Sequence, residues 1–274
     1  MTALEVVRGV ASELAESGVP SPRVDAEILV AHVLGTTRSA LYADPDVSED
    51  DIDGLSPLVA RRRAREPLAY VLGEWGFRKL TLKVDGRVLI PRPETEVLVE
   101  RCLARLEALA DPRVLDVGVG SGAIALAIAA EHRGSSVLAV DRSRDALAAA
   151  AENLARSSVD GRVALRQSDL LDGLAGPFDL VVSNPPYVAP ADYDTLQPEI
   201  RLYEPREALV GVGVGAEIAR AARRLLTPGG WLVLECGDGQ ADELATELDE
   251  LGYLGVVKSP DLAGRLRVVE GRWP

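Results

Sequence analysis

Cysteine and histidine are scarce in this chain of 274 residues, and their scarcity argues against two kinds of site. The 2 cysteines, Cys102 and Cys236, lie far apart and lack the paired spacing of a zinc site or a disulfide framework. The 2 histidines, His32 and His132, lie outside every motif described below. We therefore expect no metal site and no catalytic histidine base.

Positive charge is also in short supply. The chain has 30 Lys and Arg against 43 Asp and Glu, which gives a net charge of −13. Such a balance opposes nonspecific binding to a phosphate backbone, so we expect no direct nucleic-acid partner. The one basic cluster, Arg61–Arg65, is expected to be a solvated face of a helix, with a docking patch as the alternative.

Long apolar runs are missing as well. No stretch reaches membrane-spanning length, and the first residues lack a basic region followed by a long apolar segment. We therefore expect a cytoplasmic protein with no membrane partner. At 47% hydrophobic residues, the chain can still bury one substantial core and a smaller second domain.

The most informative segment that is present is Asn184-Pro185-Pro186-Tyr187, which follows the apolar run 178–182. The two prolines fix their own φ and disfavour helix before them, so Asn184 is held in extended geometry. Its side chain and the Pro185 carbonyl are then available as acceptors, which can hold a planar amide or an exocyclic amine. For Asn-Pro alone, a simple turn at the end of a strand is the alternative.

A glycine-rich segment lies upstream of this motif and follows the apolar run 114–117. It predicts a strand, a tight turn and a helix, because glycines allow close backbone approach and a helix start offers unpaired N–H groups. Ala123 also satisfies the relaxed dinucleotide fingerprint, so a nicotinamide cofactor stays an alternative. The segment is Gly118-Val119-Gly120-Ser121-Gly122.

Acidic residues follow the next two predicted strands. Asp141 comes after the strand 136–140 and is suited to binding a ribose diol, with a helix cap as the alternative. Asp169 and Leu170 follow the strand 163–167, where a carboxylate and an apolar side chain could receive an adenine edge and face. Four consecutive strand ends therefore carry glycine or polar chemistry, which is where open α/β sheets bind ligands.

The two halves of the chain have different patterns. Apolar residues at helical spacing predict three helices that end near Gly18, Gly35 and Arg65, and so a small helical bundle. Alternation over 74–84, with Asp85-Gly86 as a turn signal, predicts a β-hairpin linker. After it, apolar strands and helices alternate, which predicts a doubly wound, mostly parallel α/β sheet covered by helices.

Taken together, these motifs resemble the class I S-adenosylmethionine-dependent methyltransferases, and more closely the release factor glutamine methyltransferases. The resemblance covers nearly the whole chain. Two departures are the segment Gly211–Gly215, which lacks an acidic residue often seen after the paired glycines, and Arg78, which replaces a frequent aromatic. The resemblance is carried by the glycine segment with Asp116, by Asp141, by Asn184–Tyr187 and by Leu89-Ile90-Pro91-Arg92-Pro93-Glu94-Thr95-Glu96.

This resemblance implies a seven-stranded class I methyltransferase sheet whose last two strands pair antiparallel. It implies a helical bundle over residues 1–72 that docks release factors, a β-hairpin linker over 73–90 and a methyltransferase domain over 91–274. The cofactor would be S-adenosyl-L-methionine and the product S-adenosyl-L-homocysteine. The residues expected to bind the cofactor are Gly118, Val119, Gly120, Ser121, Gly122, Asp141, Asp169, Leu170 and Asn184.

The implied reaction is methylation of the side-chain amide nitrogen N(5) of the glutamine in the Gly-Gly-Gln motif of peptide chain release factors. The expected catalytic residues are Asn184, Pro185 and Tyr187, and Pro186 joins them in binding the substrate. Asn184 and Pro185 would accept both amide N–H groups, and Tyr187 would pack on the amide plane. We expect the loop 188–205 to shape the substrate mouth and 91–95 to line the other side of the cofactor pocket.

Three other functions fit parts of the sequence. DNA adenine N(6)-methyltransferases use a similar Asn-Pro-Pro-Tyr clamp on a flipped base, although the acidic chain counts against this. A nicotinamide-dependent reductase would explain the glycines but would leave Asn184 to Tyr187 without a role. A non-enzymatic cofactor-binding protein is the third alternative, because a fold does not guarantee activity.

Overall fold

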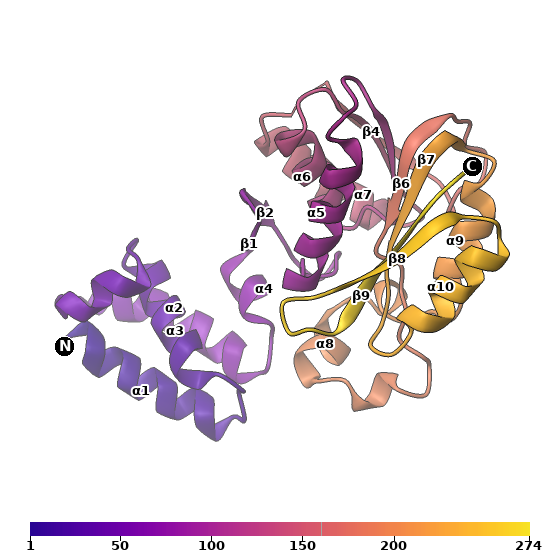
Figure 1. Ribbon diagram of the computed structural model, residues 1–274. Coiled ribbons are helices and arrows are strands. Elements are labelled where there is room, and N and C mark those ends of the chain that lie inside the picture. The colour runs from indigo at the N-terminus through magenta and orange to yellow at the C-terminus, as the bar shows by residue number, and fades with distance from the viewer. Residues whose placement is uncertain (160) are drawn as a thin grey trace. The chain divides into compact units, whose positions relative to one another are not determined.

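The computed structural model describes residues 1–159 and 161–274, which form two compact units (Figure 1). The helical unit comprises Met1–Glu74 and Leu196–Tyr203, and the sheet unit comprises Trp75–Thr195 and Glu204–Pro274. The domain ranges expected from the sequence are continuous, whereas the structure assigns residues Leu196–Tyr203 to the helical unit. Within the described ranges, no helix combines the length and the apolar character needed to cross a membrane.

The helical unit is built from amphipathic helices around a small apolar core. Two of its helices begin with capping boxes, which Thr2 and Glu5 form at α1 and Ser48 and Asp51 form at α3. Leu14, Leu29 and Leu41 are among the side chains buried at its centre. The elements are α1 (Ala3–Glu16), α2 (Pro22–Val33), η1 (Arg38–Ala43), α3 (Glu49–Arg63), α4 (Leu68–Leu72) and α8 (Pro198–Tyr203).

Arg62, at the centre of the arginine cluster Arg61–Arg65, belongs to an internal ion-pair network, so the expectation of a solvated face or a docking patch is wrong for this residue. Arg62 is only 4% exposed and donates to Asp25 at 2.8 Å and to Glu199 of α8 at 2.9 Å. Arg65 donates to the same Glu199 carboxylate at 2.6 and 2.8 Å. A buried arginine needs such partners. The contacts of Arg62 with Asp25 and Glu199 join α3 to α2 and α8.

The two-stranded hairpin is present, but its turn is not at the predicted position. Strands β1 (Glu74–Phe77) and β2 (Leu80–Lys83) pair across Arg78 and Lys79, whereas Asp85-Gly86 begins a separate turn after the hairpin. Arg78 adopts a left-handed φ of 50°, which is unusual for a residue with a side chain. Its guanidinium binds Glu131 at 2.5 and 3.0 Å. These bonds stabilise a turn that lacks the glycine usually found at a left-handed position.

The sheet unit contains the predicted seven-stranded sheet, in the order β5-β4-β3-β6-β7-β9-β8. The strands from β5 to β7 are parallel, and β9 pairs antiparallel with both β7 and β8. This confirms the expected doubly wound, mostly parallel fold with an antiparallel end. The strands are β3 (Arg113–Val117), β4 (Ser136–Asp141), β5 (Val163–Gln167), β6 (Phe178–Ser183), β7 (Leu226–Glu235), β8 (Leu254–Pro260) and β9 (Leu266–Arg272).

Helices cover both faces of this sheet, so alternate residues of each central strand enter different cores (Figure 1). In β6, Leu180 and Val182 pack with one set of helices, while Val181 packs with the other. The first set is α5 (Pro93–Leu106), α6 (Ala123–Glu131) and α7 (Arg144–Arg156), and the second is α9 (Val214–Ala222) and α10 (Ala241–Glu250). Short 3-10 turns, η2 (Tyr193–Thr195) and η3 (Arg206–Ala208), lie in the segment between β6 and α9.

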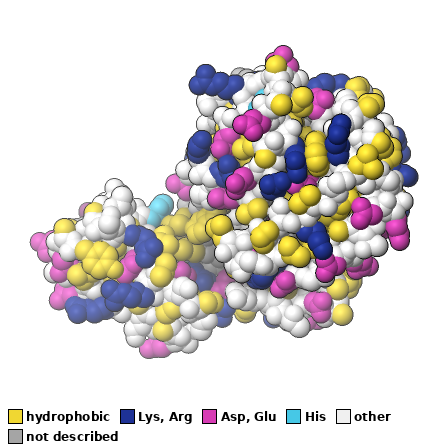
Figure 2. Space-filling view, in the orientation of Figure 1, with side chains coloured by type: hydrophobic (Ala, Val, Ile, Leu, Met, Phe, Trp, Pro, Cys, Tyr) yellow, Lys and Arg dark blue, Asp and Glu magenta, His cyan; other side chains and the backbone are white. Residues whose placement is uncertain are grey.

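Charged side chains are mixed on the surface. On the face drawn in Figure 2, Lys and Arg are scattered among Asp and Glu and do not gather into a continuous basic area. The net charge of the whole chain, −13, opposes nonspecific attraction to a phosphate backbone.

Candidate functional site

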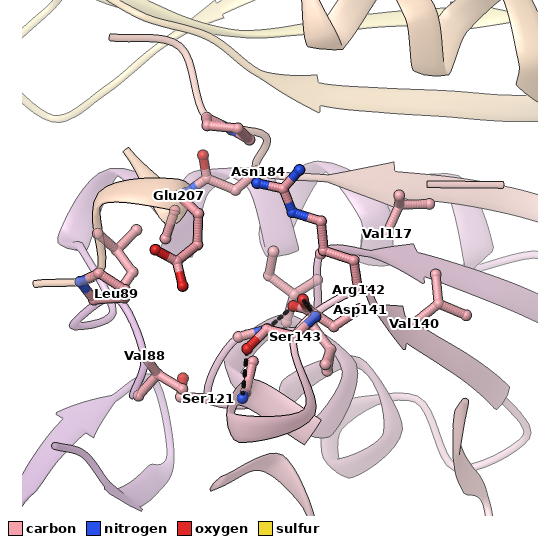
Figure 3. A pocket seen from close by; sticks show the side chains of 18 of the residues that line it. Val88, Leu89, Val117, Ser121, Val140, Asp141, Arg142, Ser143, Asn184 and Glu207 are labelled. Atoms are coloured by element: carbon pink, nitrogen blue, oxygen red, sulfur yellow. Dashed lines mark hydrogen bonds between the residues drawn. The ribbon is translucent and has the colours of Figure 1, made fainter. Parts of the chain in front are cut away.

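A cavity of about 360 Å³ lies in the sheet unit where strands β3, β4, β5 and β6 end (Figure 3). Its volume is within the range of small-molecule sites. The residues that line it come from these strand ends, from the segment before α5 and from the segment before α9. They include Val88, Leu89, Pro91, Arg92, Thr95, Gly118, Val119, Gly120, Ser121, Asp141, Arg142, Ser168, Asp169, Leu170, Asn184, Pro186, Pro205, Glu207, Val210 and Glu217.

The glycine segment forms one wall of the cavity. Gly118, Gly120 and Gly122 have left-handed φ values of 82°, 52° and 88°, which other residues adopt only with strain. The N–H groups of Gly118 and Val119 both donate to the Val140 carbonyl, at 2.8 and 2.9 Å. The structure thus brings four of the five predicted residues to the cavity and leaves Gly122 behind it, as the N-cap of α6.

Asp116 supports this wall from below. Its side chain is fully buried, and one carboxylate oxygen accepts a bond from the Ala125 N–H in the first turn of α6, at 3.1 Å. The other oxygen has no hydrogen-bond partner in the described part of the chain. Burial raises the pKa of this carboxyl to about 8, and the charge of Asp141 adds to the increase.

Asp141 holds the glycine wall to the start of α7. Its carboxylate accepts bonds from the Gly120 N–H at 3.1 Å and from the Ser143 N–H at 2.9 Å. Asp141 also lines the cavity, and its bond to the Ser143 N–H lies next to the start of α7. Asp169 and Leu170 line the neighbouring part of the cavity, as their position after β5 predicts.

The Asn184 side chain reaches the same cavity from the end of β6. Its Nδ2 donates to the Thr95 hydroxyl at 3.2 Å, so the Nδ2 side of the amide is engaged by α5. Burial raises the pKa of Glu235, which ends β7, to about 7, and the Thr95 side chain opposes that rise. We call the segment Asn184–Tyr187 the clamp. Its asparagine and the glycine wall thus border one cavity.

The other residues of the clamp are placed less directly. Pro186 lines the cavity, whereas Pro185 is buried and Tyr187 is half-buried, and neither contributes to the lining. The Tyr187 carbonyl accepts a bond from Gln240 at 3.1 Å. Burial raises the pKa of the Tyr187 hydroxyl to about 12, with a contribution from the charge of Glu235.

Gly211 fixes the position of the diproline segment. A Cβ at this residue would lie 2.8 Å from the Pro186 carbonyl oxygen, a distance that side-chain atoms do not reach without movement. Next to this contact, Val188 and Val210 form an isolated parallel bridge. The backbone after the clamp is therefore packed closely against the segment that leads into α9.

A buried ion pair joins the two remaining walls. Glu204 accepts bonds from the Arg92 guanidinium and from the Ile90 N–H, the latter at 3.2 Å. Burial raises the pKa of Glu204, while the charge and the hydrogen bond of Arg92 oppose that increase. As expected from the sequence, the 91–95 segment lines the cavity. Of the loop 188–205, only Pro205 does so, and residues 207–217 supply the rest of that wall.

Some residues of the site were not identified from the sequence. Glu207 and Arg142 line the cavity, and Figure 3 shows the Glu207 carboxylate directed into it. Glu235, a buried acid, ends β7 beside β6, and an acid at the end of an apolar strand of such a sheet is a usable signal. Throughout residues 1–159 and 161–274, no group of three or more Cys, His, Asp or Glu side chains could hold a metal ion.

Two family models match the chain. The PrmC N-terminal domain matches residues 5–73, and the methyltransferase small domain matches residues 94–201. Among solved structures, the Thermus thermophilus 16S rRNA N2 G1207 methyltransferase, in complex with AdoMet and guanosine, is similar with a TM-score of 0.55 and 18% identity. That similarity covers 73% of this chain and 50% of the other, and it shows the fold alone.

Curated relatives resemble the chain over nearly its whole length. The release factor glutamine methyltransferase of Deinococcus radiodurans is 44% identical over 269 residues, which cover 95% of each chain. The protein of the same name from Geobacter sulfurreducens is 42% identical over 266 residues, covering 94% of this chain and 92% of the relative. With both domains matched and this level of identity, the chain belongs to the family of release factor glutamine methyltransferases.

Proposed function

We propose that this protein transfers a methyl group from S-adenosyl-L-methionine to the side-chain amide nitrogen N(5) of the glutamine in the Gly-Gly-Gln motif of release factors. The observation that carries the proposal is that the Asn184 amide and the glycine wall border one cavity. A methyl donor and a carboxamide acceptor need such an arrangement, because the two reacting atoms must meet in a fixed geometry.

The lining residues suit the cofactor. Asp141 offers a carboxylate for a ribose diol, and Asp169 with Leu170 offers a polar edge and an apolar face for an adenine ring. The glycines of the segment Gly118–Ser121 allow the methionine part of the cofactor to approach the backbone closely. When bound, the cofactor supplies a methyl group on a positively charged sulfur, and its product is S-adenosyl-L-homocysteine. We propose these residues, with Asn184, as its binding site.

The chain's own groups would act on the glutamine by orientation. An amide nitrogen is a poor nucleophile because its lone pair is delocalised into the carbonyl. In this proposal, the Asn184 Oδ1 and the Pro185 carbonyl accept the two N–H groups of the glutamine and favour the charge that develops on its nitrogen. Positioning of this kind can lower a barrier by roughly 7 to 11 kcal/mol in favourable cases.

Pro186 and Tyr187 would complete the substrate site. Pro186 lines the cavity beside Asn184 and can flank the glutamine side chain. Tyr187 would pack its ring on the plane of the glutamine amide. This requires the glutamine to enter from the side on which the Tyr187 ring lies. We further propose that residues 1–72 and the linker 73–90 dock the release factor, with the catalytic domain over 91–274.

The direct test is mass analysis of a release factor after incubation with the enzyme and S-adenosyl-L-methionine. We expect one added methyl on the Gly-Gly-Gln glutamine, and none on a release factor in which that glutamine is replaced by alanine. Duplex DNA serves as a second acceptor in the same assay. Methyl transfer to adenine in place of glutamine would contradict the proposal.

A further inference from the structure

We propose that Asn153 is a positioning residue for the cofactor, because its side chain connects two walls of the cavity. This inference rests on the proposed function, in which the cavity binds S-adenosyl-L-methionine. Asn153 belongs to α7 and is not among the residues that line the cavity. One of the two walls is the glycine wall. The other is the segment 87–89, which follows β2 and which we call the linker wall.

The Asn153 side chain makes three hydrogen bonds to two segments of the chain. Its Nδ2 donates to the Ser121 carbonyl at 2.8 Å, and Ser121 is part of the glycine wall. The same Nδ2 donates to the Lys83 carbonyl at 2.9 Å, and Oδ1 accepts from the Lys83 N–H at 2.7 Å. Lys83 is the last residue of β2, directly before the turn that leads to the linker wall. One side chain thus joins both segments.

These bonds fix the orientation of the Asn153 amide. Asn153 is 2% exposed, so water cannot readily replace a lost partner. If the amide were reversed, its oxygen would face two carbonyl oxygens and its NH₂ group would face an N–H. Both protons of the NH₂ group are used, so each bond that is lost leaves a buried polar group unpaired. The side chain therefore holds Ser121 and Lys83 at a fixed separation.

The neighbouring Glu152 supports the linker wall by a different route. Its carboxylate accepts bonds from Lys83 Nζ at 2.6 Å and from the Arg87 guanidinium at 2.8 Å, and Arg87 lines the cavity. The Glu152 side chain is 39% exposed, so these ion pairs are partly screened by water. Glu152 thus supports the linker wall, whereas Asn153 connects it to the glycine wall.

This connection has a consequence for cofactor binding. Val88 of the linker wall and Ser121 of the glycine wall both line the cavity (Figure 3). A cofactor that binds only when the glycine wall is in place stabilises the bonds that hold this wall, including those of Asn153. The bound cofactor should therefore also protect the Lys83 N–H, which is bonded to the same amide.

Hydrogen exchange of the Lys83 N–H tests the connection without measuring activity. In the wild type, saturating S-adenosyl-L-methionine should slow this exchange by at least about tenfold. Asn153→Asp replaces the NH₂ group by an oxygen of similar size, which faces the carbonyls of Ser121 and Lys83. In this variant the cofactor should slow the exchange by less than about threefold. Equal protection in the two proteins, or none in the wild type, would overturn the inference.

The matched control for the exchange experiment is Glu152→Gln. This substitution weakens the ion pairs of the linker wall but leaves Asn153 in place. The cofactor should still protect the Lys83 N–H in this variant. If Glu152→Gln abolishes the protection as fully as Asn153→Asp does, support of the linker wall is sufficient and the connection through Asn153 is refuted.

Cofactor affinity gives the second readout. Asn153→Asp should raise the dissociation constant for S-adenosyl-L-methionine by about 10- to 100-fold, because a buried carbonyl of the glycine wall loses its donor. The kcat with a release factor at saturating cofactor should stay within about threefold, since the bound cofactor restores the wall. An unchanged dissociation constant, or a loss confined to kcat, would contradict a positioning role for the cofactor.

Two further variants separate this role from a general loss of stability. Asn153→Ser removes both amide donors without adding a charge, so it should raise the dissociation constant as well, even if Asn153→Asp does not fold. Leu106 is 1% exposed in the core that contains the α6 residues and does not line the cavity. Leu106→Ala should lower the urea midpoint and leave the dissociation constant within about threefold. A similar rise in this constant for Leu106→Ala would overturn the inference.

The proposed function and this inference can fail separately. If the wild type binds S-adenosyl-L-methionine but methylates no release factor, the proposed function is contradicted, while the exchange and the dissociation constants still test Asn153. If the wild type does not bind S-adenosyl-L-methionine, both are overturned.

Discussion

The guanidinium of Arg62 and the carboxylate of Glu199 meet at 2.9 Å in the interior of the helical unit, although they are 137 residues apart in the sequence. Glu199 belongs to α8, which begins 11 residues after the end of the segment Asn184–Tyr187. The side chains of Arg62 and Glu199 are 5% and 11% exposed. The segment that follows the clamp is therefore fixed at its far end by a buried ion pair.

Replacing Glu199 by glutamine should destabilise the protein by about 2 to 5 kcal/mol, because the buried arginines lose a charged partner. Arg62 keeps Asp25, so the loss is smaller than for a wholly unpaired guanidinium. Urea denaturation measures this free energy of unfolding.

The matched control for this change is Glu13→Gln. Glu13 pairs with Arg63 on the surface of the same unit, with both side chains about half exposed. We expect a change of less than about 1 kcal/mol there, because water screens the pair. Equal effects of the two substitutions would show that the pair with Glu199 is not buried in solution.

Gly211→Ala should lower methyltransferase activity by distorting the clamp. The added Cβ would lie 2.8 Å from the Pro186 carbonyl oxygen, so the diproline segment or the backbone at Gly211 must move. We expect at least about a tenfold loss of kcat/KM, because small misplacements near the reacting atoms are costly. Steady-state kinetics on a release factor measure this effect.

The same glycine-rich segment provides the control. A Cβ at Gly215 would be 3.7 Å from the nearest atom, a Leu244 methyl, which is ordinary contact, and Gly215 lies within α9. Gly215→Ala should therefore raise the stability by roughly 0.5 to 1 kcal/mol and leave the activity close to that of the wild type. Activity losses of similar size in both variants would contradict the role of the Gly211 contact.

Asn184→Ala should abolish most of the turnover and leave cofactor binding largely intact. Removing one preorganised acceptor from a reacting group typically costs about 100- to 1000-fold in kcat. The dissociation constant for S-adenosyl-L-methionine, measured by calorimetry, should change by less than about threefold. An equal loss of both would indicate that Asn184 serves cofactor binding and not the amide.

The regular elements of the sheet unit could be predicted because their signals are local. The strand Val163–Gln167 has the predicted bounds, and Ser136–Asp141 extends the predicted strand 136–140 by one residue, since the signal of each lies within its own residues. The convergence of Asn184 with the glycine wall could also be predicted, because parallel strands end at the same edge of a sheet.

The features that were missed depend on partners distant in the sequence. Nothing beside Arg62 in the sequence reveals Glu199, so a run of arginines looks like a solvated face. The hairpin turn at Arg78 was missed because an arginine with a left-handed φ is stabilised by Glu131 and not by its own preference. The bond from Asn184 to Thr95 likewise joins separate elements.

Glu235→Gln should change how the stability of the protein depends on pH. Burial raises the pKa of Glu235 from 4.5 to about 7, so between these values the folded protein holds a proton that the unfolded chain has released. The wild type therefore loses stability as the pH rises, by up to about 1.4 kcal/mol per pH unit, and the loss levels off above about pH 7. Glutamine does not ionise, so the stability of the variant relative to the wild type should increase by roughly 3 kcal/mol over this range.

Urea denaturation of both proteins at about pH 5, 6, 7 and 8 measures this difference. Taking the difference cancels Asp116, whose raised pKa acts in the same direction. A difference that is flat with pH would show that Glu235 ionises as an ordinary surface carboxyl.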